Sequence, residues 1–224
     1  MLLDNFRLIN EEFHADRVLP EQMDSLLEKG WRHFGTHFFR YNVGFLRDEL
    51  RFVLPLRIRL ADFTFSKSRR RILRRNEDLN VEIRPIAIDS DAEEIFRRHK
   101  SRFNHGVPDS IYNFLSDQPA VSPCEAKEVR VTSGDRLLAV SYFDIGRAAT
   151  SGIYAMFEPT ISSRGLGIFT MLKEIEYSIE TGCEFYYQGY AYDGESFYDY
   201  KKRFRATEAF DWRQNWNSFI AETQ

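Results

Sequence analysis

The stretch Ser162-Ser163-Arg164-Gly165-Leu166-Gly167-Ile168 decides the fold, because it separates two segments with different periodicities. Residues 149–157 before it are typical of a strand, and residues 169–180 after it have the amphipathic spacing of a helix. A strand, a tight turn with two glycines and a helix N-terminus together present unpaired backbone N–H groups to a phosphate or a carbonyl oxygen. Glycines in such a turn also relieve crowding without any ligand, so the motif alone leaves both interpretations open.

The segments around this glycine turn (residues 162–168) predict the order of the sheet. The segments with strand character are residues 128–132, 137–145, 149–157 and 184–188, the last of which ends at Gly189-Tyr190. A meander that leads into a strand-turn-helix-strand unit resembles the Gcn5-related N-acyltransferase fold, and the glycine turn resembles its pyrophosphate loop, although Ser162 stands where acetyltransferases often carry Gln or Arg. We therefore predict an α/β (α+β) fold with a mixed, mostly antiparallel sheet flanked by helices.

Composition places the chain among globular proteins. Of its 224 residues, 43% are hydrophobic and 15% aromatic, which is enough for a buried core. No apolar run approaches the roughly 20 residues that cross a bilayer, so we expect a cytoplasmic protein with no membrane partner. Cys124 and Cys183 are too few for a disulfide framework and are not spaced as a metal pair. We expect an N-terminal extension over residues 1–49 that packs on an acyltransferase-like domain over residues 50–224.

Two basic clusters stand out in a chain whose formal net charge is -3. The first, residues 66–76, holds Arg71, Arg74 and Arg75 on one face of a predicted helix, where their charges repel unless an anion is near. The alternative is a solvated helix face paired with the acidic residues that follow it. The second is Lys201-Lys202-Arg203-Phe204-Arg205. Two such clusters in an acidic chain favour an anion held at a defined place over diffuse binding of nucleic acid.

A series of short segments between about Gly30 and Glu208 carries a family resemblance. In the first half these segments are residues 31–40, Leu56-Arg57-Ile58-Arg59 and residues 65–76. In the second half they are Ile153-Tyr154 with Phe157-Glu158-Pro159, Leu166-Gly167-Ile168-Phe169, residues 186–190, and residues 200–205 with Glu208. Their order and character resemble the arginyl/leucyl-tRNA–protein transferase family, and the shared order along the chain is what carries the resemblance.

Two departures limit what the resemblance implies. Family members usually carry a cysteine cluster near the N-terminus, whereas the corresponding stretch here is Tyr41-Asn42-Val43-Gly44-Phe45-Leu46. A metal or cluster is therefore not implied, and we expect no cofactor besides the aminoacyl-tRNA donor. Ala206 stands where the family usually has proline. We interpret the chain as a divergent member.

The resemblance implies transfer of an aminoacyl group from the 3′ end of a charged tRNA to the α-amine of an acceptor protein or peptide, often one that begins with Asp or Glu. The ester is already activated, so the site must align the amine, stabilise the oxyanion and remove a proton, with no need for a protein nucleophile. The N–H groups that follow Gly165 and Gly167 can hold the oxyanion or the 3′ end of the donor. Tyrosines can relay protons or stack on the terminal adenosine, with core packing as the alternative for each.

The predicted site residues fall into four groups. The catalytic group is Tyr187, Tyr190 and Gly167. The donor-binding group is Ser163, Arg164, Gly165, Leu166 and Gly167. The tRNA-binding group is Ser66, Arg69, Arg70, Arg74 and Arg75. The acceptor-binding group is Tyr200, Lys201 and Arg205, in which Lys201 or Arg205 pairs with an acceptor carboxylate; the alternative is that these cations are only surface charges.

The sequence leaves other functions open. An acetyl-CoA-dependent N-acetyltransferase would use the same glycine turn for the pyrophosphate, and a non-catalytic relative would only bind tRNA or an acidic peptide end. His33 and His37 have the i, i+4 spacing of metal ligands on a helix, but their phenylalanine neighbours indicate an extended segment, in which four residues span about 13 Å. We interpret His99 and His105 as positive charges near a helix C-terminus.

Overall fold

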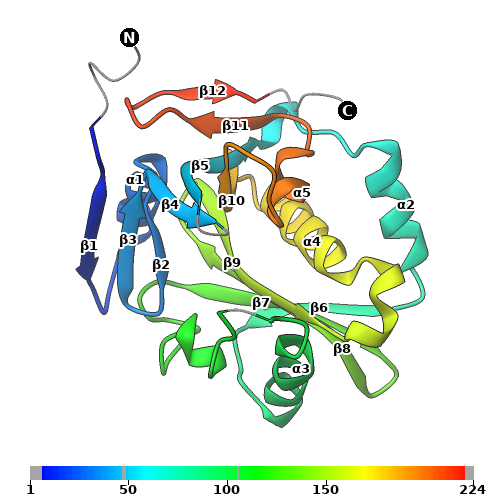
Figure 1. Ribbon diagram of the computed structural model, residues 1–224. Coiled ribbons are helices and arrows are strands. Elements are labelled where there is room, and N and C mark those ends of the chain that lie inside the picture. The colour runs from blue at the N-terminus through cyan, green and yellow to red at the C-terminus, as the bar shows by residue number, and fades with distance from the viewer. Residues whose placement is uncertain (1–6, 47–48, 105, 220–224) are drawn as a thin grey trace.

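The computed structural model describes residues 7–46, 49–104 and 106–219, and these form two sheets (Figure 1). The smaller sheet is antiparallel and has the strand order β1-β3-β2. Its strands are β1 (Asn10–His14), β2 (Arg32–Phe34) and β3 (His37–Tyr41), and helix α1 (Pro20–Glu28) joins β1 to β2.

The larger sheet has nine strands in the order β12-β11-β5-β10-β9-β8-β7-β6, with β4 paired to β5 beside this path. These strands are β4 (Val43–Leu46), β5 (Glu49–Arg59), β6 (Asn80–Pro85), β7 (Ala126–Ser133), β8 (Arg136–Ile145), β9 (Ala149–Phe157), β10 (Phe185–Tyr192), β11 (Thr207–Phe210) and β12 (Trp216–Ser218). In the part of the chain that the structure describes, every strand pair is antiparallel except β9 with β10. The predicted mixed, mostly antiparallel sheet is therefore confirmed.

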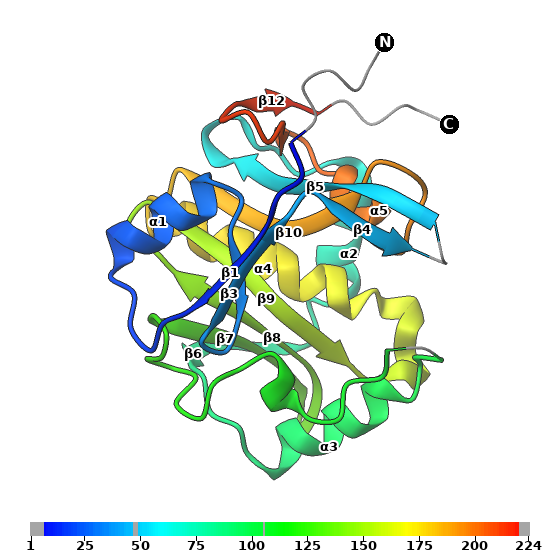
Figure 2. The ribbon, with the colours of Figure 1, turned by 60° about the vertical axis from the view of Figure 1, so that its left-hand side comes forward.

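Helices α3 (Ser90–Lys100) and α4 (Leu166–Glu180) cover opposite faces of the larger sheet (Figures 1 and 2). Successive side chains of a strand point to opposite faces, so β8 contributes to both cores. Tyr142 packs with Phe96 of α3, and Phe143 packs with Phe169 of α4. Each such aromatic side chain, fully removed from water, stabilises the fold by about 1.5–3 kcal/mol. Central strands buried on both faces provide a rigid frame for the site.

Two further α-helices and three 3-10 helices complete the described fold. Helix α2 (Lys67–Arg75) contacts α4, and the short helix α5 (Asp199–Lys202) contacts β10. Three short 3-10 helices are η1 (Leu60–Asp62), η2 (Ile111–Asn113) and η3 (Pro159–Arg164). The longest helix, α4, has 15 residues, and none of the described helices is long and apolar enough to cross a bilayer.

The structure confirms the three meander strands and corrects two local predictions. Helix α4 begins at Leu166 rather than Phe169, so Gly167 lies in its first turn. The chain reverses one residue earlier, at Gly165, whose φ of 69° is in the left-handed region that favours glycine. Strand β10 does not end at Gly189 but continues to Tyr192, because β5 supplies a hydrogen-bonding partner along its other edge.

The N-terminal residues are joined to the larger sheet by strand pairing. Strand β4 pairs with β5 from Val43↔Phe52 to Leu46↔Glu49. The Tyr190 hydroxyl of β10 also donates a hydrogen bond to the Gly30 carbonyl, 2.6 Å away. The division of the chain into an extension over residues 1–49 and a domain over residues 50–224 stays a prediction.

Candidate active site

The parallel pair β9–β10 separates after three residue pairs. Ala149–Ser151 pair with Phe185–Tyr187, and beyond them β9 follows β8 while β10 follows β5. A bulge between Tyr187 and Gly189, with Gly189 at φ 86°, marks the point of separation. We call the two unpaired stretches, residues 152–157 of β9 and 188–192 of β10, the strand split. It lies at the carboxyl ends of the parallel strands, where open α/β sheets bind ligands.

Arg32 of β2 lies in the strand split. Its Nη1 donates a hydrogen bond to the Ser151 hydroxyl, and its Nη2 donates to the Gly152 carbonyl. Burial lowers the pKa of the guanidinium, and the charge of Asp144 opposes this effect. Arg32 therefore crosses from the smaller sheet into the larger one and holds β9 at its last paired residue.

Lys201 of α5 reaches the same place from the other side. Its Nζ donates to the Tyr190 carbonyl over 3.1 Å. Gly189 has no side chain between the two cations: an ideal Cβ there would lie 3.2 Å from the Lys201 Nζ and 3.7 Å from the Arg32 Nη2. Burial, with the Arg32 charge as a second cause, lowers the pKa of Lys201 to about 7.

A buried carboxyl lies beneath the split. Glu174 of α4 accepts hydrogen bonds from the Ser141 and Tyr186 hydroxyls, and burial raises the pKa of Glu174 to about 7. Gly152 makes room for this group, since an ideal Cβ at residue 152 would lie 2.8 Å from the Tyr186 hydroxyl and 3.2 Å from Glu174 Oε2. A carboxyl with a pKa near neutrality is suited to accept and return a proton.

Unpartnered polar groups lie on both strands of the split. Gln188 of β10 is 4% exposed, and neither its amide nitrogen nor its amide oxygen has a hydrogen-bond partner in the described structure. The buried Tyr154 hydroxyl of β9 also lacks one. Buried polar groups without partners are rare in folded proteins, and other such groups in this structure lie away from the split. The Tyr154 ring stacks on Phe114 in the core under α3, so Gln188 is the group that leaves a donor and an acceptor for a ligand at the split.

The glycine turn is held by α2 instead of lying open. Arg75 Nη1 donates to the Ser163 carbonyl, Asn76 Nδ2 donates to the Arg164 carbonyl over 3.0 Å, and Arg164 pairs with Asp78 at 2.6 Å. The Ile168 N–H, expected to be available to a ligand, donates to the Gly165 carbonyl over 3.1 Å. The N–H prediction is therefore wrong for Ile168.

Gly167 relieves crowding, which is the alternative that the sequence left open for the glycines of this turn. It is helical, and an ideal Cβ there would lie 3.0 Å from the Phe157 ring of β9, so glycine allows α4 to start close to the sheet. Leu166 beside it is fully buried. Of the two glycines in the turn, Gly165 has a positive φ and Gly167 does not.

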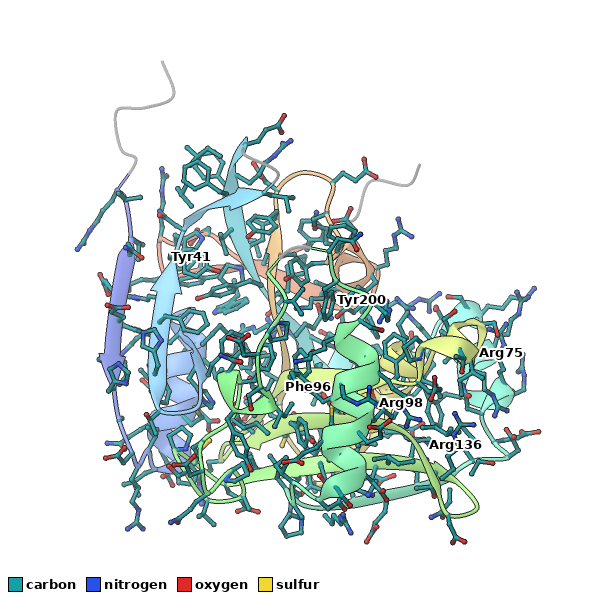
Figure 3. The ribbon with its side chains drawn as sticks, turned by 60° about the horizontal axis from the view of Figure 1, so that its bottom comes forward. Tyr41, Arg75, Phe96, Arg98, Arg136 and Tyr200 are labelled. Atoms are coloured by element: carbon teal, nitrogen blue, oxygen red, sulfur yellow. The ribbon has the colours of Figure 1, made fainter. Side chains whose placement is uncertain are left out.

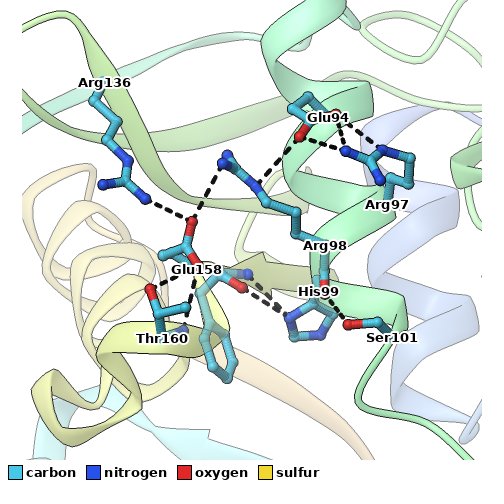
Figure 4. A network of polar contacts seen from close by, with 9 residues as sticks. Glu94, Arg97, Arg98, His99, Ser101, Arg136, Glu158 and Thr160 are labelled. Carbon is cyan, nitrogen blue, oxygen red and sulfur yellow. Dashed lines mark hydrogen bonds and ion pairs between the residues drawn. The ribbon is translucent and has the colours of Figure 1, made fainter.

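A polar network anchors the segment between β9 and the glycine turn (Figure 4). The buried Glu158 pairs with Arg136 at 2.9 Å and with Arg98 at 3.4 Å. It also accepts hydrogen bonds from the Thr160 N–H and hydroxyl. Burial alone would raise the pKa of Glu158, but the Thr160 and Arg136 hydrogen bonds lower it overall. The network caps η3 and so fixes the path of the chain into the turn.

Helix α2 presents most of its predicted tRNA-binding cations to solvent. Ser66 is its N-cap and accepts from the Arg69 N–H. Arg70, Arg74 and Arg75 are exposed, and Figure 3 shows Arg75 at the outer edge of the molecule. Arg69 is the exception: it is buried, donates to the Tyr200 carbonyl over 3.2 Å and lies 4.2 Å from the Phe204 ring. Arg69 thus joins α2 to α5 and does not face the surface.

The two predicted catalytic tyrosines have hydroxyls bonded within the protein. Tyr187 accepts from Arg57 Nη1 at 3.3 Å and packs against Trp216, and burial raises its pKa to about 12. Burial likewise raises the pKa of Tyr190, whose hydroxyl is bonded to Gly30. Their catalytic role stays a prediction, and in the structure Tyr190 contributes its carbonyl to Lys201.

The three predicted acceptor-binding residues lie apart. Lys201 points into the strand split, and burial raises the pKa of neighbouring Tyr200 to about 12. Arg205 instead donates to Thr64 Oγ1 at the exposed surface, 2.9 Å away. The sequence assigned no role to Arg32, Gly152, Glu174 or Gln188. A glycine inside strand 149–157 was the one available signal, since glycine within a strand often marks close approach of another group.

One group of potential metal ligands is buried beside the split. His33, Cys124 and Asp144 place one ligand atom each within 4.8 Å of one another. His33 bonds to Asp144 at 2.9 Å through Nε2 and to the Gly35 carbonyl at 2.8 Å through Nδ1, and Cys124 donates to Asp144 at 3.4 Å. These side chains thus have hydrogen-bond partners within the protein. The His33–Asp144 bond also connects the smaller sheet to the larger one. The expectation of one extended segment through His33 and His37 is wrong, because His33 lies in β2 and His37 in β3, and these strands pair with each other after a turn at residues 35–36. The His37 ring pairs with Glu12.

His99 is not the positively charged helix end that we expected. It is 3% exposed, its Nδ1 accepts the Phe157 N–H at 3.1 Å, and burial lowers its pKa to about 4. A neutral ring is needed for that acceptor, so the charge interpretation is wrong for His99. His105 lies outside the described residues.

This histidine should make stability depend on pH. Between about pH 6.5 and 4 the unfolded chain binds a proton at His99 that the folded chain does not, so the free energy of unfolding falls as the pH falls, by at most about 1.4 kcal/mol per pH unit from this group. His99→Gln should flatten that dependence, although it lowers stability overall. Urea unfolding at pH 4.5, 5.5, 6.5 and 7.5 measures both slopes. Equal slopes for the two proteins would contradict the prediction.

The mixed sheet flanked by helices is compatible with the Gcn5-related N-acyltransferase fold, and comparisons with known proteins identify the family. A family model described as "Arginine-tRNA-protein transferase, C terminus" matches residues 93–211. The aspartate/glutamate leucyltransferase of Stenotrophomonas maltophilia (strain R551-3) is 33% identical over 218 residues, which cover 92% of this chain and 84% of that protein. The protein of the same name from Helicobacter hepaticus (strain ATCC 51449 / 3B1) is 24% identical over 92% of this chain and 86% of that one.

The chain belongs to the arginine-tRNA-protein transferase family. It is therefore an aminoacyl-tRNA–protein transferase, with a charged tRNA as donor and a protein as acceptor, and the acetyl-CoA alternative gains no support. Among solved structures, the crystal structure of FemX is similar in fold, with a TM-score of 0.54 and 11% identity over 89% of this chain and 69% of that chain.

Proposed function

We propose that the protein transfers a leucyl group from leucyl-tRNA to the α-amine of a cytoplasmic protein that begins with Asp or Glu, and that the reaction takes place at the strand split. The names of the similar proteins support the leucyl donor and the acidic acceptor. The observation that carries the location is the convergence of Arg32 and Lys201 at Gly189, beside the unpartnered Gln188 amide. Charged tRNA as the donor supports a cytoplasmic location.

The tRNA would approach along α2. Its exposed arginines suit the phosphates of the acceptor stem, and Arg75 and Asn76 connect this helix to the glycine turn. Helix α2 is also joined to α5 through Arg69 and Tyr200. The 3′ end of a tRNA bound at α2 can therefore reach the strand split between the glycine turn and α5.

The chemistry needs alignment and one proton acceptor. The neutral α-amine attacks the ester carbonyl, an amide C–N bond forms, and the ester C–O bond breaks. The proton lost from nitrogen passes through the Tyr186 hydroxyl to Glu174 and returns to the leaving ribose oxygen. A pKa of about 7 allows Glu174 to accept the proton and release it at neutral pH. No protein nucleophile is required, because the aminoacyl ester is already activated.

The donor is tested by direct competition. The purified protein is incubated with an acceptor peptide that begins with Asp and with leucyl-tRNA, arginyl-tRNA or acetyl-CoA, and the product is identified by mass spectrometry. We expect the peptide to gain the mass of one leucyl residue when the donor is leucyl-tRNA and to remain unmodified with the other two donors. An arginyl product would overturn the choice of amino acid. Acetylation without aminoacyl transfer would overturn the proposed function.

A further inference from the structure

We infer that Arg32 and Lys201 together bind the side-chain carboxylate of the acceptor's first residue and thereby select acidic acceptors. This inference rests on the proposed function and adds to it the residues that determine specificity. It assigns a role to Arg32, which comes from the smaller sheet. Of the two cations that the sequence offered for the acceptor carboxylate, Lys201 and Arg205, it keeps Lys201.

The first argument is the missing counter-charge. The other arginines that are buried in the larger sheet have close carboxylates: Arg57 pairs with Glu208 at 2.7 Å, and Arg130 pairs with Asp89 at 2.9 Å. Arg32 and Lys201 form no ion pair with any described residue, and their hydrogen bonds go to a hydroxyl and to backbone carbonyls. The charge of Asp144 acts on Arg32 from beyond ion-pair distance. Partly buried cations without a direct ion pair cost free energy, which a bound anion offsets.

The second argument is geometry. Both cationic groups lie beside Gly189, since the Lys201 Nζ is 3.2 Å and the Arg32 Nη2 is 3.7 Å from the position that a Cβ would take there. A carboxylate has two oxygens, so one group that lies between the two cations, in van der Waals contact with Gly189, can accept a hydrogen bond from each. The two cationic groups are therefore close enough for a single carboxylate to contact both.

The third argument decides between a carboxylate and a tRNA phosphate. The exposed arginines of α2 already offer contacts for phosphates. Arg32 and Lys201 are only half-exposed at the strand split, and a single side chain reaches such a place more easily than a polynucleotide backbone does. In an N-terminal Asp the α-amine is only a few bonds from the carboxylate. A carboxylate at Gly189 would thus leave the amine close to Gly152, where Tyr186 and Glu174 lie.

The test is peptide binding in the absence of tRNA, measured by isothermal titration calorimetry. Two peptides differ only in their first residue, Asp or Asn. For the unaltered protein we expect the Asp peptide to bind about 10-fold more tightly or better, since a hydrogen bond to a charged group is stronger than one to a neutral group. Arg32→Gln and Lys201→Met should each remove most of that difference and leave the affinity for the Asn peptide nearly unchanged.

Matched variants distinguish carboxylate binding by Arg32 and Lys201 from a general effect of removing positive charge. Lys202→Met removes the neighbouring lysine, which pairs with Asp199 at 2.8 Å, and should keep the preference for Asp. Arg205→Gln should also keep it. Because Arg32 holds Ser151 and Gly152 and its variant can unfold, Lys201→Met alone decides the outcome in that case. Loss of the preference in Arg205→Gln but not in Lys201→Met would overturn the inference.

The pH dependence gives an independent readout. The groups that face Lys201 are Arg32 on β2, Tyr190 on β10 and the Tyr198 ring before α5, 5.0 Å away. As the pH rises through about 7 the free protein loses the Lys201 proton, so the affinity for the Asp peptide should fall between pH 6 and 8. Lys201→Arg keeps its charge over that range and should bind the Asp peptide with little pH dependence.

Failure of the inference can be told from failure of the proposed function. Equal binding of the Asp and Asn peptides by the unaltered protein overturns the inference, even if leucyl transfer occurs. Weaker tRNA binding in Lys201→Met with unchanged peptide binding also overturns it, because the anion would then be a phosphate. A charge preference that Lys201→Met removes supports the inference, even if the transferred group is not leucyl.

Discussion

Replacing Gly152 with valine is expected to abolish aminoacyl transfer and to lower the melting temperature. The new Cβ would lie 2.8 Å from the Tyr186 hydroxyl and 3.2 Å from Glu174 Oε2, and neither group can move far because they are bonded to each other inside the core. Overpacking of this kind typically costs about 1–3 kcal/mol. Any backbone shift that relieves it also moves the Gly152 carbonyl away from Arg32.

Activity and folding are measured separately for this variant. The rate of transfer is compared with the fraction of protein that melts cooperatively, and Gly152→Ala provides a milder change of the same kind. Gly134→Asn is the matched control, because Gly134 lies in a hairpin turn with open space around it and asparagine tolerates its positive φ. A folded Gly152→Val protein with ordinary activity would show that the reaction does not take place at the strand split.

Removing three exposed arginines of α2 is expected to weaken tRNA binding by at least about 10-fold at physiological salt and to weaken it uniformly across tRNA sequences. Arg70, Arg71 and Arg74 are the residues to change to alanine, since all three are exposed. Arg69 and Arg75 are left in place because they hold α5 and the glycine turn. The slope of log affinity against log salt should fall by roughly 0.7–0.9 for every phosphate that the variant no longer neutralises.

A second triple variant removes the same charge elsewhere. Lys29, Arg97 and Arg147 are exposed on other parts of the molecule, and their replacement by alanine should change the salt slope little. Filter binding with charged tRNA at several salt concentrations measures both variants. Equal slopes for the two would mean that α2 is a solvated basic face, the alternative that its sequence left open.

The local elements were largely predictable from the sequence, because their signals are local. Alternation of apolar residues and tight turns predicted the meander strands, and β9 has the predicted bounds of residues 149–157. The start of α4 was misplaced by three residues, since a glycine in the first turn of a helix and a glycine in a turn have the same appearance in a sequence. The end of β10 was missed for a related reason. The strand continues past the bulge at Gly189 only because β5 lies alongside and pairs with it, and the sequence does not show that pairing.

The site was predictable only in part. Lys201 was found through the basic cluster and the family resemblance, and it lies in the strand split. Arg205, four residues later, has the same chemistry but points to the surface. Arg69 and Arg70 are neighbours in the sequence, yet one is buried and the other exposed. Which face of a short helix is buried depends on what packs against it, and the sequence of the helix does not contain that information.

By itself, the sequence determined the class of fold and the family. Strand and helix periodicity and the order of short motifs depend only on which residues follow one another along the chain. Only the tertiary structure showed which side chains meet at the strand split, where we propose that the reaction takes place. Arg32 and Lys201 are far apart in the sequence and meet at Gly189 because β9 and β10 pair over three residues and then separate. Tyr186 of β10 donates a hydrogen bond to Glu174 because α4 packs on that face of the sheet. Such contacts depend on how several elements pack together, and burial then sets the pKa values of Lys201 and Glu174 near neutrality.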